Sequence, residues 1–303
     1  MQEETNQGQT EETGQKTPFR NRVKSALVNL ILAASIALLL KIMFVETTYV
    51  TSSSMENTIL AGDFIFVNKF LFGAKNEINF PLFGIDSLVI NIPGLRQPER
   101  GEIVLFKNPG KRDELYPSEK INFVKRCIGL PGDTVQIKGG KVFINGKELH
   151  YSDPVDFGSD EYSANQYQNL LFPKGTTWTI DNYGPLYIPR KGDEIKLTVE
   201  NTELYRTLID REIGDKSLTI AGSHVEIDGM FTAIYQVKED YFFVLGDNRH
   251  ESADSRYWGF LPESKILGKV FLVYWSNDPK IQDSLNSGFL SNIRWNRIAK
   301  ILY

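Results

Sequence analysis

Three consecutive serines at positions 52–54, directly before Met55 in the stretch TSSSMENT, could supply a nucleophile. A serine hydroxyl is a weak nucleophile, so it needs a neighbouring base that takes its proton. Histidine is the usual base, and the chain has only three, none of them near the serines in sequence: His150, His224 and His250. A lysine can replace histidine only when its amine is neutral, which requires its pKa to fall from about 10.4. Burial among apolar residues lowers a lysine pKa in this way, so the serines direct attention to lysines with apolar neighbours.

One such lysine is Lys125 in the stretch INFVKRCIGLPGD, with Phe123 and Val124 before it and Cys127 after it. If the stretch forms a strand, alternation places Lys125 on the face shared by Phe123 and Cys127, and Arg126 on the opposite face. An apolar face would give the amine a dry environment. The alternative is an ordinary solvated lysine, and this stretch by itself does not distinguish the two.

The composition narrows the classes of protein and site. A net charge of -4 argues against a nucleic-acid partner, which would require a concentrated basic face. The single cysteine, Cys127, excludes an intramolecular disulfide, and we expect it to pack as a small apolar side chain. The three histidines stand at no metal-ligand spacing from one another or from the cysteine, so we expect neither a metal nor another cofactor. The sequence leaves the oligomeric state open.

The N-terminal region predicts a membrane anchor. Residues 1–24 form a polar tail that ends in the basic stretch FRNRVK, and residues 25–45 are almost wholly apolar. About 20 helical residues reach about 30 Å, the hydrocarbon thickness of a bilayer. The cations before the apolar stretch favour a cytoplasmic N-terminus, with everything after residue 45 on the outer side of the cytoplasmic membrane. A cleaved signal peptide is the competing interpretation, but the following residues, VETTYVTSSSM, contain no A-x-A cleavage site.

Beyond residue 48 the sequence predicts a mostly β protein with antiparallel sheets. Short apolar runs bounded by Gly, Pro, Asn and Asp are typical of strands joined by tight turns, and they occur at 63–70, 101–108, 133–146, 193–201, 223–229, 241–247 and 268–275. We expect a compact main β-domain in two parts, 46–150 and 239–280, with a smaller β-rich domain inserted at 151–238. One short helix is predicted at about 204–213.

A glycine followed by an acidic residue opens four of these runs: Gly62-Asp63, Gly101-Glu102, Gly132-Asp133 and Gly192-Asp193. The glycine can supply a positive φ angle, and the acidic side chain can accept hydrogen bonds from nearby backbone. We therefore expect a turn that leads into a strand at each position. Gly139-Gly140 and Asn145-Gly146 predict two further tight turns, on either side of a hairpin strand.

The C-terminal residues 281–303 are amphipathic. In FLSNIRWNRIAKILY the cations Arg294, Arg297 and Lys300 recur at every third position among apolar residues. This pattern predicts a short helix that lies either on anionic lipid or against the folded domain.

Four segments, in order after the apolar N-terminal stretch, closely resemble the conserved boxes of bacterial type I signal peptidases: SSSMENTILAGDFIFVNK, RGEIVLFKNP, FVKRCIGLPGDTVQIKGGKVFINGK and GDNRHESADSRYWGFLP. The resemblance covers about residues 50–150 and 240–275. It implies a membrane-anchored serine endopeptidase that removes N-terminal signal peptides from exported preproteins through an acyl-enzyme formed by a Ser/Lys dyad. The two-part β-domain would be the catalytic domain, and the partners would be preproteins and the lipid bilayer.

The resemblance also implies a role for each matching residue. Ser54 takes the nucleophile position and Lys125 that of the general base, while Ser52 and the backbone N–H of Ser54 form the oxyanion hole. Ser252 matches the serine that orients the lysine amine. Val50 and Val124 match residues that line shallow pockets for small substrate side chains. A supporting structural role falls to four charged residues: Arg126, Asp247, Asp254 and Arg256.

Three positions depart from the family pattern. Thr51 and Asn57 stand where proline is common, and Ser53 stands where glycine is common. None of the three changes removes a reacting atom, but the two missing prolines leave the loop conformation less constrained. His250 and Glu251 occupy a pair of positions that varies within the family, so we expect no catalytic role for His250.

Two other functions stay open. An envelope protein could retain this scaffold only to bind exported peptides, a reading supported by the long middle segment and by the departures. A self-cleaving regulator could use the same dyad, but it would bring a DNA-binding module, and the sequence of residues 1–48 offers none.

Overall fold

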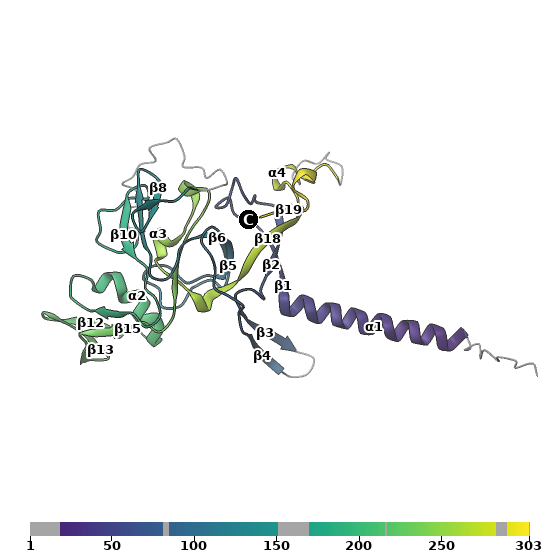
Figure 1. Ribbon diagram of the computed structural model, residues 1–303, viewed down its shortest axis with the longest axis horizontal. Coiled ribbons are helices and arrows are strands. Elements are labelled where there is room, and N and C mark those ends of the chain that lie inside the picture. The colour runs from purple at the N-terminus through teal and green to yellow at the C-terminus, as the bar shows by residue number, and fades with distance from the viewer. Residues whose placement is uncertain (1–18, 81–84, 151–169, 216, 283–289, 303) are drawn as a thin grey trace, which may run out of the picture. The chain divides into compact units, whose positions relative to one another are not determined.

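The computed structural model describes residues 19–80, 85–150, 170–215, 217–282 and 290–302, and the chain divides into two compact units, Met1–Ile42 and Met43–Tyr303. Helix α1 (Phe19–Phe44) covers most of the predicted span at 25–45 (Figure 1). Among the described residues, no helix combines the length and the apolar character needed to cross a bilayer, so the transmembrane span stays a prediction. Most of the predicted polar tail (1–18) and the first part of the predicted insertion (151–169) lie outside the described residues.

The second unit consists mainly of antiparallel strands, which confirms the expected fold class (Figure 1). Its largest sheet, within the described residues, has eight strands in the order β1-β2-β18-β5-β6-β16-β17, with β19 paired to β18. The bounds are β1 (Val45–Tyr49), β2 (Asp63–Asn68), β5 (Ile103–Lys107), β6 (Asn122–Gly129), β16 (Tyr241–Leu245), β17 (Leu261–Pro262), β18 (Ile266–Ser276) and β19 (Lys300–Ile301).

Strand β5 lies in the middle of this sheet with both faces buried, as its continuous apolar run indicates. Ile103 and Leu105 pack into one hydrophobic cluster, whereas Val104 and Phe106 pack into another. The two clusters hold the sheet from both sides, because successive side chains of a strand point to opposite faces. Strand β6 pairs with β5 in a fixed register that sets Lys125 opposite Val104.

Four smaller sheets complete the described part of the second unit. They contain the strands β10-β7-β8-β9, β11-β15, β12-β13-β14 and β3-β4. The bounds are β3 (Ala74–Phe80), β4 (Ile85–Ile92), β7 (Thr134–Lys138), β8 (Lys141–Ile144), β9 (Lys147–Glu148), β10 (Tyr183–Tyr187), β11 (Glu194–Lys196), β12 (Leu218–Ala221), β13 (His224–Ile227), β14 (Met230–Phe231) and β15 (Ile234–Gln236). The two predicted tight turns are confirmed, since Lys138 pairs with Lys141 and Ile144 pairs with Lys147 across them.

The four glycine–acid turns share one geometry, which confirms the expected turn chemistry. In each, the acidic residue's backbone N–H donates to the carbonyl of the residue three positions earlier, and its carboxylate accepts that residue's N–H. The distances from this N–H to the carboxylate are 2.9 Å at Leu60, 2.8 Å at Glu99, 2.7 Å at Leu130 and 2.8 Å at Arg190. Each glycine has a positive φ, as the third position of a type II turn requires.

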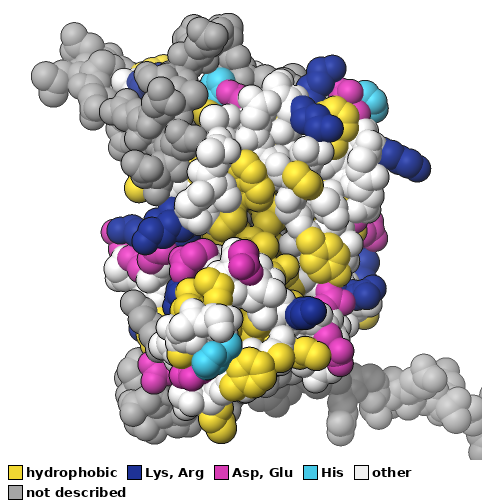
Figure 2. All heavy atoms as spheres, turned by 90° about the vertical axis from the view of Figure 1, so that its left-hand side faces the viewer, with side chains coloured by type: hydrophobic (Ala, Val, Ile, Leu, Met, Phe, Trp, Pro, Cys, Tyr) yellow, Lys and Arg dark blue, Asp and Glu magenta, His cyan; other side chains and the backbone are white. Residues whose placement is uncertain are grey.

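The described middle of the chain, 170–215 and 217–238, holds the predicted short helix as α2 (Thr202–Ile213). Residues from this stretch share a hydrophobic cluster with β7 and β8, and β10 pairs directly with β7. The boundary of an inserted domain at 151 therefore stays a prediction. Figure 2 shows the side of the molecule that carries this region, where hydrophobic side chains are exposed between charged ones; those on β12–β15 are Ile220, Met230, Phe231 and Ile234.

The helix expected near the C-terminus is wrong for the described residues 290–302. This stretch has only a 3₁₀ turn, η5 (Trp295–Arg297), before the short strand β19. Lys300 and Ile301 pair with Val273 and Leu272 of β18, so pairing with a sheet edge replaces the helix. The remaining short helices of the described part are α3 (Ser255–Trp258), α4 (Pro279–Gln282) and two 3₁₀ helices, η3 (Arg249–Glu251) and η4 (Glu263–Lys265).

Candidate active site

Ser54 lies in a tight turn between β1 and β2 that its apolar neighbours anchor. The side chains of Met55 and Ile59 are 1% and 0% exposed and pack into the cluster that contains Ile103. Backbone N–H groups of Thr58 and Ile59 donate to the Met55 carbonyl over 3.1 and 2.8 Å and close the turn. Ser54 itself is buried, so its hydroxyl is largely screened from water.

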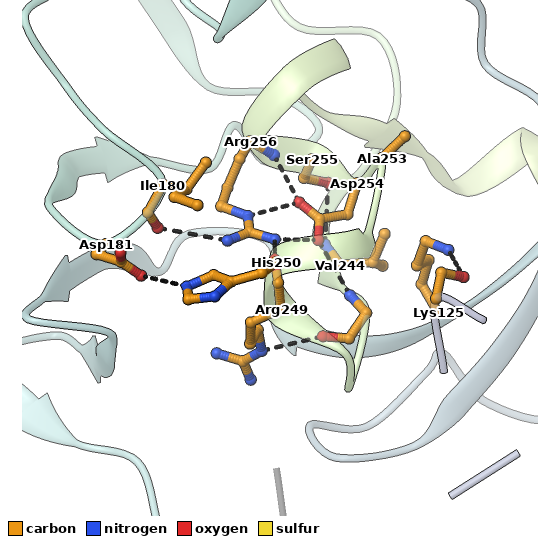
Figure 3. Close-up of polar contacts among 12 residues, drawn as sticks. Lys125, Ile180, Asp181, Val244, Arg249, His250, Ala253, Asp254, Ser255 and Arg256 are labelled. Carbon is orange, nitrogen blue, oxygen red and sulfur yellow. Dashed lines mark hydrogen bonds and ion pairs between the residues drawn. The ribbon is translucent and has the colours of Figure 1, made fainter. Parts of the chain in front are cut away.

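Strand β6 brings Lys125 to this hydroxyl. The Lys125 Nζ donates a hydrogen bond to the Ser54 Oγ over 2.5 Å (Figure 3). Lys125 is 3% exposed, and its Nζ lies 5.8 Å from the centre of the Phe123 ring, so the predicted sharing of one face by these two residues is confirmed. When the amine is neutral, the same contact lets the hydroxyl donate to Nζ, which is the geometry that a proton transfer needs.

The electrostatic surroundings of Lys125 allow a fraction of its amine to be neutral near physiological pH. The pKa of Lys125 is lowered from 10.5 to about 8, chiefly by burial and to a smaller extent by the charge of Arg256. The carboxylates of Asp254 and Asp247 oppose this effect, because a nearby negative charge favours the ammonium form. Desolvation dominates, so a lysine in this position can serve as a base without a histidine.

Ser52 lies beside the same hydroxyl. Its Oγ is 3.2 Å from the Ser54 Oγ, and the residue is exposed to solvent. The structure thus brings Ser52, Ser54 and Lys125 together, as the resemblance implied. The role of Ser52 in an oxyanion hole stays a prediction, since it concerns an atom of the substrate.

Ser252 lies close to the site without bonding to the amine. Its hydroxyl is buried and has no hydrogen-bond partner among the described residues, so the expected contact with Lys125 is not made in this structure. Gly246 shows how closely the segments of Ser252 and Ser54 approach each other. A Cβ atom at position 246 would lie 2.2 Å from the Ser252 Oγ and 2.4 Å from the Ser54 carbonyl oxygen. Only glycine leaves room for both groups.

A first buried ion pair holds the turn against β6. The Arg126 guanidinium donates to both carboxylate oxygens of Asp247 over 2.8 and 2.7 Å. The Thr58 hydroxyl donates to the same carboxylate over 2.7 Å. Arg126 directly follows Lys125, and Thr58 lies four positions after Ser54. This network therefore ties the segment that carries the lysine and the segment that carries the serine to one carboxylate. All three residues are buried.

A second buried ion pair shapes the segment that follows β16 (Figure 3). The Arg256 guanidinium donates to Asp254 over 2.9 and 2.8 Å, and Asp254 accepts the Gly246 N–H over 3.1 Å. Burial by itself would raise the pKa of the Asp254 carboxyl, but Arg256 holds it below its usual value. The carboxylate therefore stays charged and fixes the glycine that abuts the Ser54 carbonyl.

The two valines assigned to substrate pockets belong to one hydrophobic cluster. Val50 is 7% exposed, and Val124 packs against the same cluster while partly buried. Val50 precedes the serine turn and Val124 precedes Lys125 on β6. Their role in binding substrate stays a prediction.

The positions that depart from the family pattern have their own contacts. The Ser53 hydroxyl donates to Glu251 over 3.0 Å, and the Asn248 side-chain amide donates to the Ser53 carbonyl over 3.3 Å. Asn57 has a φ of 83°, which the ring of proline does not permit, so this turn takes a course that a proline at position 57 would forbid. A glycine at position 53 could not make the contact with Glu251.

The surroundings of His250 and Cys127 do not indicate a catalytic role for either residue. The His250 Nε2 lies 3.4 Å from Asp181 rather than at the serine (Figure 3). Cys127 is buried in the cluster with Val104, and burial raises the pKa of its thiol. A protonated thiol in that position packs as an apolar side chain.

Sequence reasoning missed three residues that bear on the site: Thr58, Gly246 and Glu251. Thr58 and Gly246 both stand inside the segments that carry the resemblance. However, Thr58 bonds to Asp247, more than 180 positions away, and Gly246 lies against Ser54 on another loop. Glu251 belongs to a pair of positions that varies within the family. Its only sequence signal was the unusual serine at position 53, which supplies its partner.

Comparison with known proteins gives a consistent result. The family model described as signal peptidase, peptidase S26, matches residues 23–275. A signal peptidase I of Buchnera aphidicola is 30% identical over 84% of this chain and 74% of that protein, and one of Pseudomonas aeruginosa is 31% identical over 83% and 72%. A crystal structure of a signal peptidase I from Enterococcus faecalis overlaps with a TM-score of 0.30 and 22% identity, covering 58% of this chain and 98% of that one, an overlap that carries no conclusion about this fold.

Proposed function

The chain belongs to the signal peptidase family, peptidase S26, and from this premise we propose that it removes N-terminal signal peptides from exported preproteins with Ser54 and Lys125 as its catalytic dyad. The observation that carries the proposal is the 2.5 Å contact between the Ser54 Oγ and the Lys125 Nζ, both on buried residues. A hydroxyl and a lysine amine this close, away from water, form a nucleophile with its base.

The reaction begins when the Ser54 Oγ adds to the scissile carbonyl carbon and its proton moves to the neutral Nζ of Lys125. The carbonyl oxygen then carries a negative charge, and the Ser52 hydroxyl, 3.2 Å from the Ser54 Oγ, lies where it could donate to that oxygen together with the Ser54 N–H. One such donor contributes about 3 kcal/mol to stabilising the transition state in other serine hydrolases.

The second half of the reaction restores the enzyme. The C–N bond breaks as Lys125 gives its proton to the leaving amine, which becomes the new N-terminus of the mature protein. A water molecule then attacks the ester, its proton passes to Nζ, and the leader leaves as a carboxylic acid while Ser54 regains its proton. The buried Ser252 hydroxyl would orient the amine once substrate has closed the site.

The substrate and a partly exposed face of the sheet support a membrane location. Signal peptides are apolar segments, so an enzyme tethered at the bilayer meets them at a raised effective concentration. Strands β1, β2 and β18 present a continuous row of aromatic rings with neighbouring centroids 4.3–6.2 Å apart: Tyr49, Phe64, Phe66, Phe271 and Tyr274. Aromatic side chains favour the membrane interface, so we propose a single span at 25–45, a cytoplasmic N-terminus and this row against the outer leaflet.

The proposed activity is tested with the purified full-length chain in detergent and a synthetic leader peptide that has alanine before the cleaved bond. Ser54→Ala and Lys125→Ala should each lower turnover by about a thousandfold or more, while Cys127→Ala should retain it because the buried thiol packs as an apolar side chain and takes no part in the proton transfer. Wild-type turnover in either dyad variant would overturn the assignment. Absence of any turnover by the wild-type chain would favour a protein that only binds exported peptides.

A further inference from the structure

The described C-terminal segment, 290–302, is attached along the turn that follows the nucleophile. The Arg297 guanidinium donates to Asp63 over 3.0 and 2.5 Å and to the Thr58 carbonyl over 2.9 Å. Asp63 is 0% exposed and Arg297 is 8% exposed, so this is a buried ion pair. Arg297 therefore holds both ends of the stretch 58–63.

The other two cations of the period-three pattern contact the same stretch. The Arg294 guanidinium donates to the Ala61 carbonyl over 2.8 Å, and the Lys300 Nζ approaches the Thr58 carbonyl at 3.5 Å. Backbone hydrogen bonds from Arg294 to Ser276 and from Leu302 to Phe271 fix the segment to β18. The three cations face protein carbonyls and a carboxylate, which explains their spacing without a lipid surface.

Thr58 connects this attachment to the reactive groups. Its carbonyl accepts from Arg297, and its hydroxyl donates to Asp247, the carboxylate that also binds Arg126. Its backbone N–H donates to the Met55 carbonyl and closes the turn directly after Ser54. Thr58 is thus held from two sides, by the C-terminal segment and by the ion pair next to Lys125.

The other three glycine–acid turns also pair their acidic residue with an arginine, but that arginine comes from nearer in the chain. Asp133 accepts the Leu130 N–H just as Asp63 accepts the Leu60 N–H, and its arginine, Arg100, comes from 33 positions away. Arg297 comes from 234 positions away, past the whole catalytic domain. At Asp63, the arginine that pairs with the acidic residue of the turn therefore comes from the C-terminal segment.

We propose that Arg297 is a positioning residue for the nucleophile: it fixes the stretch 58–63 and thereby aims the Ser54 hydroxyl at the Lys125 amine. This inference rests on the proposed peptidase function. Proton transfer and attack depend steeply on the placement of the reacting atoms, so a looser turn lowers the rate of the chemical step. The Val50 backbone bonds to Gly62 and Asp63, but the Val50 side chain, like that of Val124, is held in its own hydrophobic cluster, so substrate binding should change less than the chemical step.

The test compares Arg297→Met with Arg100→Met, which removes the corresponding arginine from the turn at Asp133. Both variants lose an ion pair and a bond to a backbone carbonyl, so both should have a lower melting temperature. With the full-length chain and the leader peptide at a temperature where both are folded, Arg297→Met should lower kcat about tenfold with KM within about twofold. Arg297→Lys, which keeps the charge, should restore part of the loss.

A second pair of variants decides the matter if Arg297→Met does not fold. Arg294→Met removes the bond to the Ala61 carbonyl, while Asp278→Asn weakens the 3.3 Å ion pair of Arg294 and leaves the bond to the Ala61 carbonyl in place. We expect a kcat lowered about threefold in the first and unchanged in the second. Wild-type kcat in Arg297→Met or Arg294→Met, or an equal loss in Arg100→Met, would overturn the inference. Absence of turnover in the wild-type chain would instead overturn the peptidase assignment itself.

Discussion

The Ser54 Oγ and the Lys125 Nζ lie 2.5 Å apart, although 71 positions separate the two residues in the chain. The serine stands in a turn anchored by Met55 and Ile59, and the lysine stands on a strand in the middle of the main sheet. Both side chains are buried. The pair therefore combines a nucleophile and a base with the dry surroundings that lower the pKa of a lysine amine and leave it free to accept a proton.

The buried lysine should destabilise the folded protein at neutral pH. Its pKa is about 8 in the folded state against 10.5 in the unfolded chain, so between these values the unfolded state binds a proton that the folded state has lost. The free energy of unfolding should therefore rise as the pH rises between these two pKa values. Below the lower value both states are protonated, and the folded state bears the full cost of burying the ammonium group, about 3 kcal/mol. Lys125→Met should therefore raise the free energy of unfolding at pH 7 and abolish the rise.

Urea unfolding at pH 7 and pH 9.5 measures both effects. Lys191→Met is the matched control, because Lys191 is exposed and its replacement should leave the pH dependence as in the wild type. A Lys125→Met variant that is less stable than the wild type at pH 7 would show that the amine is not a buried, costly group.

Replacing Ser252 should separate function from stability. Its hydroxyl is buried without a hydrogen-bond partner among the described residues, so Ser252→Ala loses no bond and should leave the unfolding free energy unchanged or raise it by about 1 kcal/mol. The same change should lower kcat about tenfold or more if the hydroxyl orients the amine during turnover. A parallel loss of stability and activity would indicate a purely structural serine.

Gly246 should not tolerate a side chain. A Cβ atom there would lie within 2.4 Å of both the Ser252 Oγ and the Ser54 carbonyl oxygen, which is far inside contact distance. Gly246→Ala should therefore displace the nucleophile and lower kcat about a hundredfold. Gly139→Ala is the control for activity: nothing lies within 4 Å of its added Cβ, and the strain at its φ of 54° should lower stability without affecting kcat. Equal activity of the two variants would contradict the crowding.

The contact between Ser53 and Glu251 should stiffen the nucleophile turn. The Ser53 hydroxyl donates to the carboxylate over 3.0 Å, and the glycine usual at this position in the family would lack it. Ser53→Ala and Glu251→Gln should each lower kcat about threefold, and the double variant should be no worse than either, because both remove one exposed bond worth about 0.5–1 kcal/mol. Additive losses in this double-mutant cycle would show that the two side chains act separately.

Local turn chemistry could be predicted from the sequence because its partners lie within a few positions. The four glycine–acid pairs predicted turns and backbone contacts, and all four formed with the acidic side chain capping the turn. The arginine that completes Asp63 could not be predicted in this way. Arg297 lies 234 positions away, and nothing near either residue indicates the pairing.

The C-terminal segment shows how tertiary contacts override a local pattern. Its cations at every third position suggested one face of a helix, and that helix is wrong for the described residues. Arg294 and Arg297 instead reach the stretch 58–63, and Lys300 belongs to a strand paired with β18. A spacing of three suits a helix face, but here it serves contacts with an irregular turn.

The candidate site could be predicted in its residue types and only partly in its contacts. The family resemblance identifies Ser54 and Lys125. It agrees with the absence of a histidine near the three serines in sequence and with the apolar neighbours of Lys125. Their proximity depends on the pairing of β5 with β6 and on the packing of Met55, which a single sequence does not encode in any short stretch. The crowding at Gly246 likewise depends on two loops meeting.

The pH dependence of kcat/KM for leader-peptide cleavage tests the central claim most directly. With the full-length chain between pH 6 and pH 10.5, the rate constant should rise about tenfold per pH unit and level off above an apparent pKa near 8, because only the neutral Lys125 amine can accept the Ser54 proton. A flat profile between pH 6.5 and pH 9.5, or the same limb in a Lys125→His variant, would contradict the assignment of this lysine as the base.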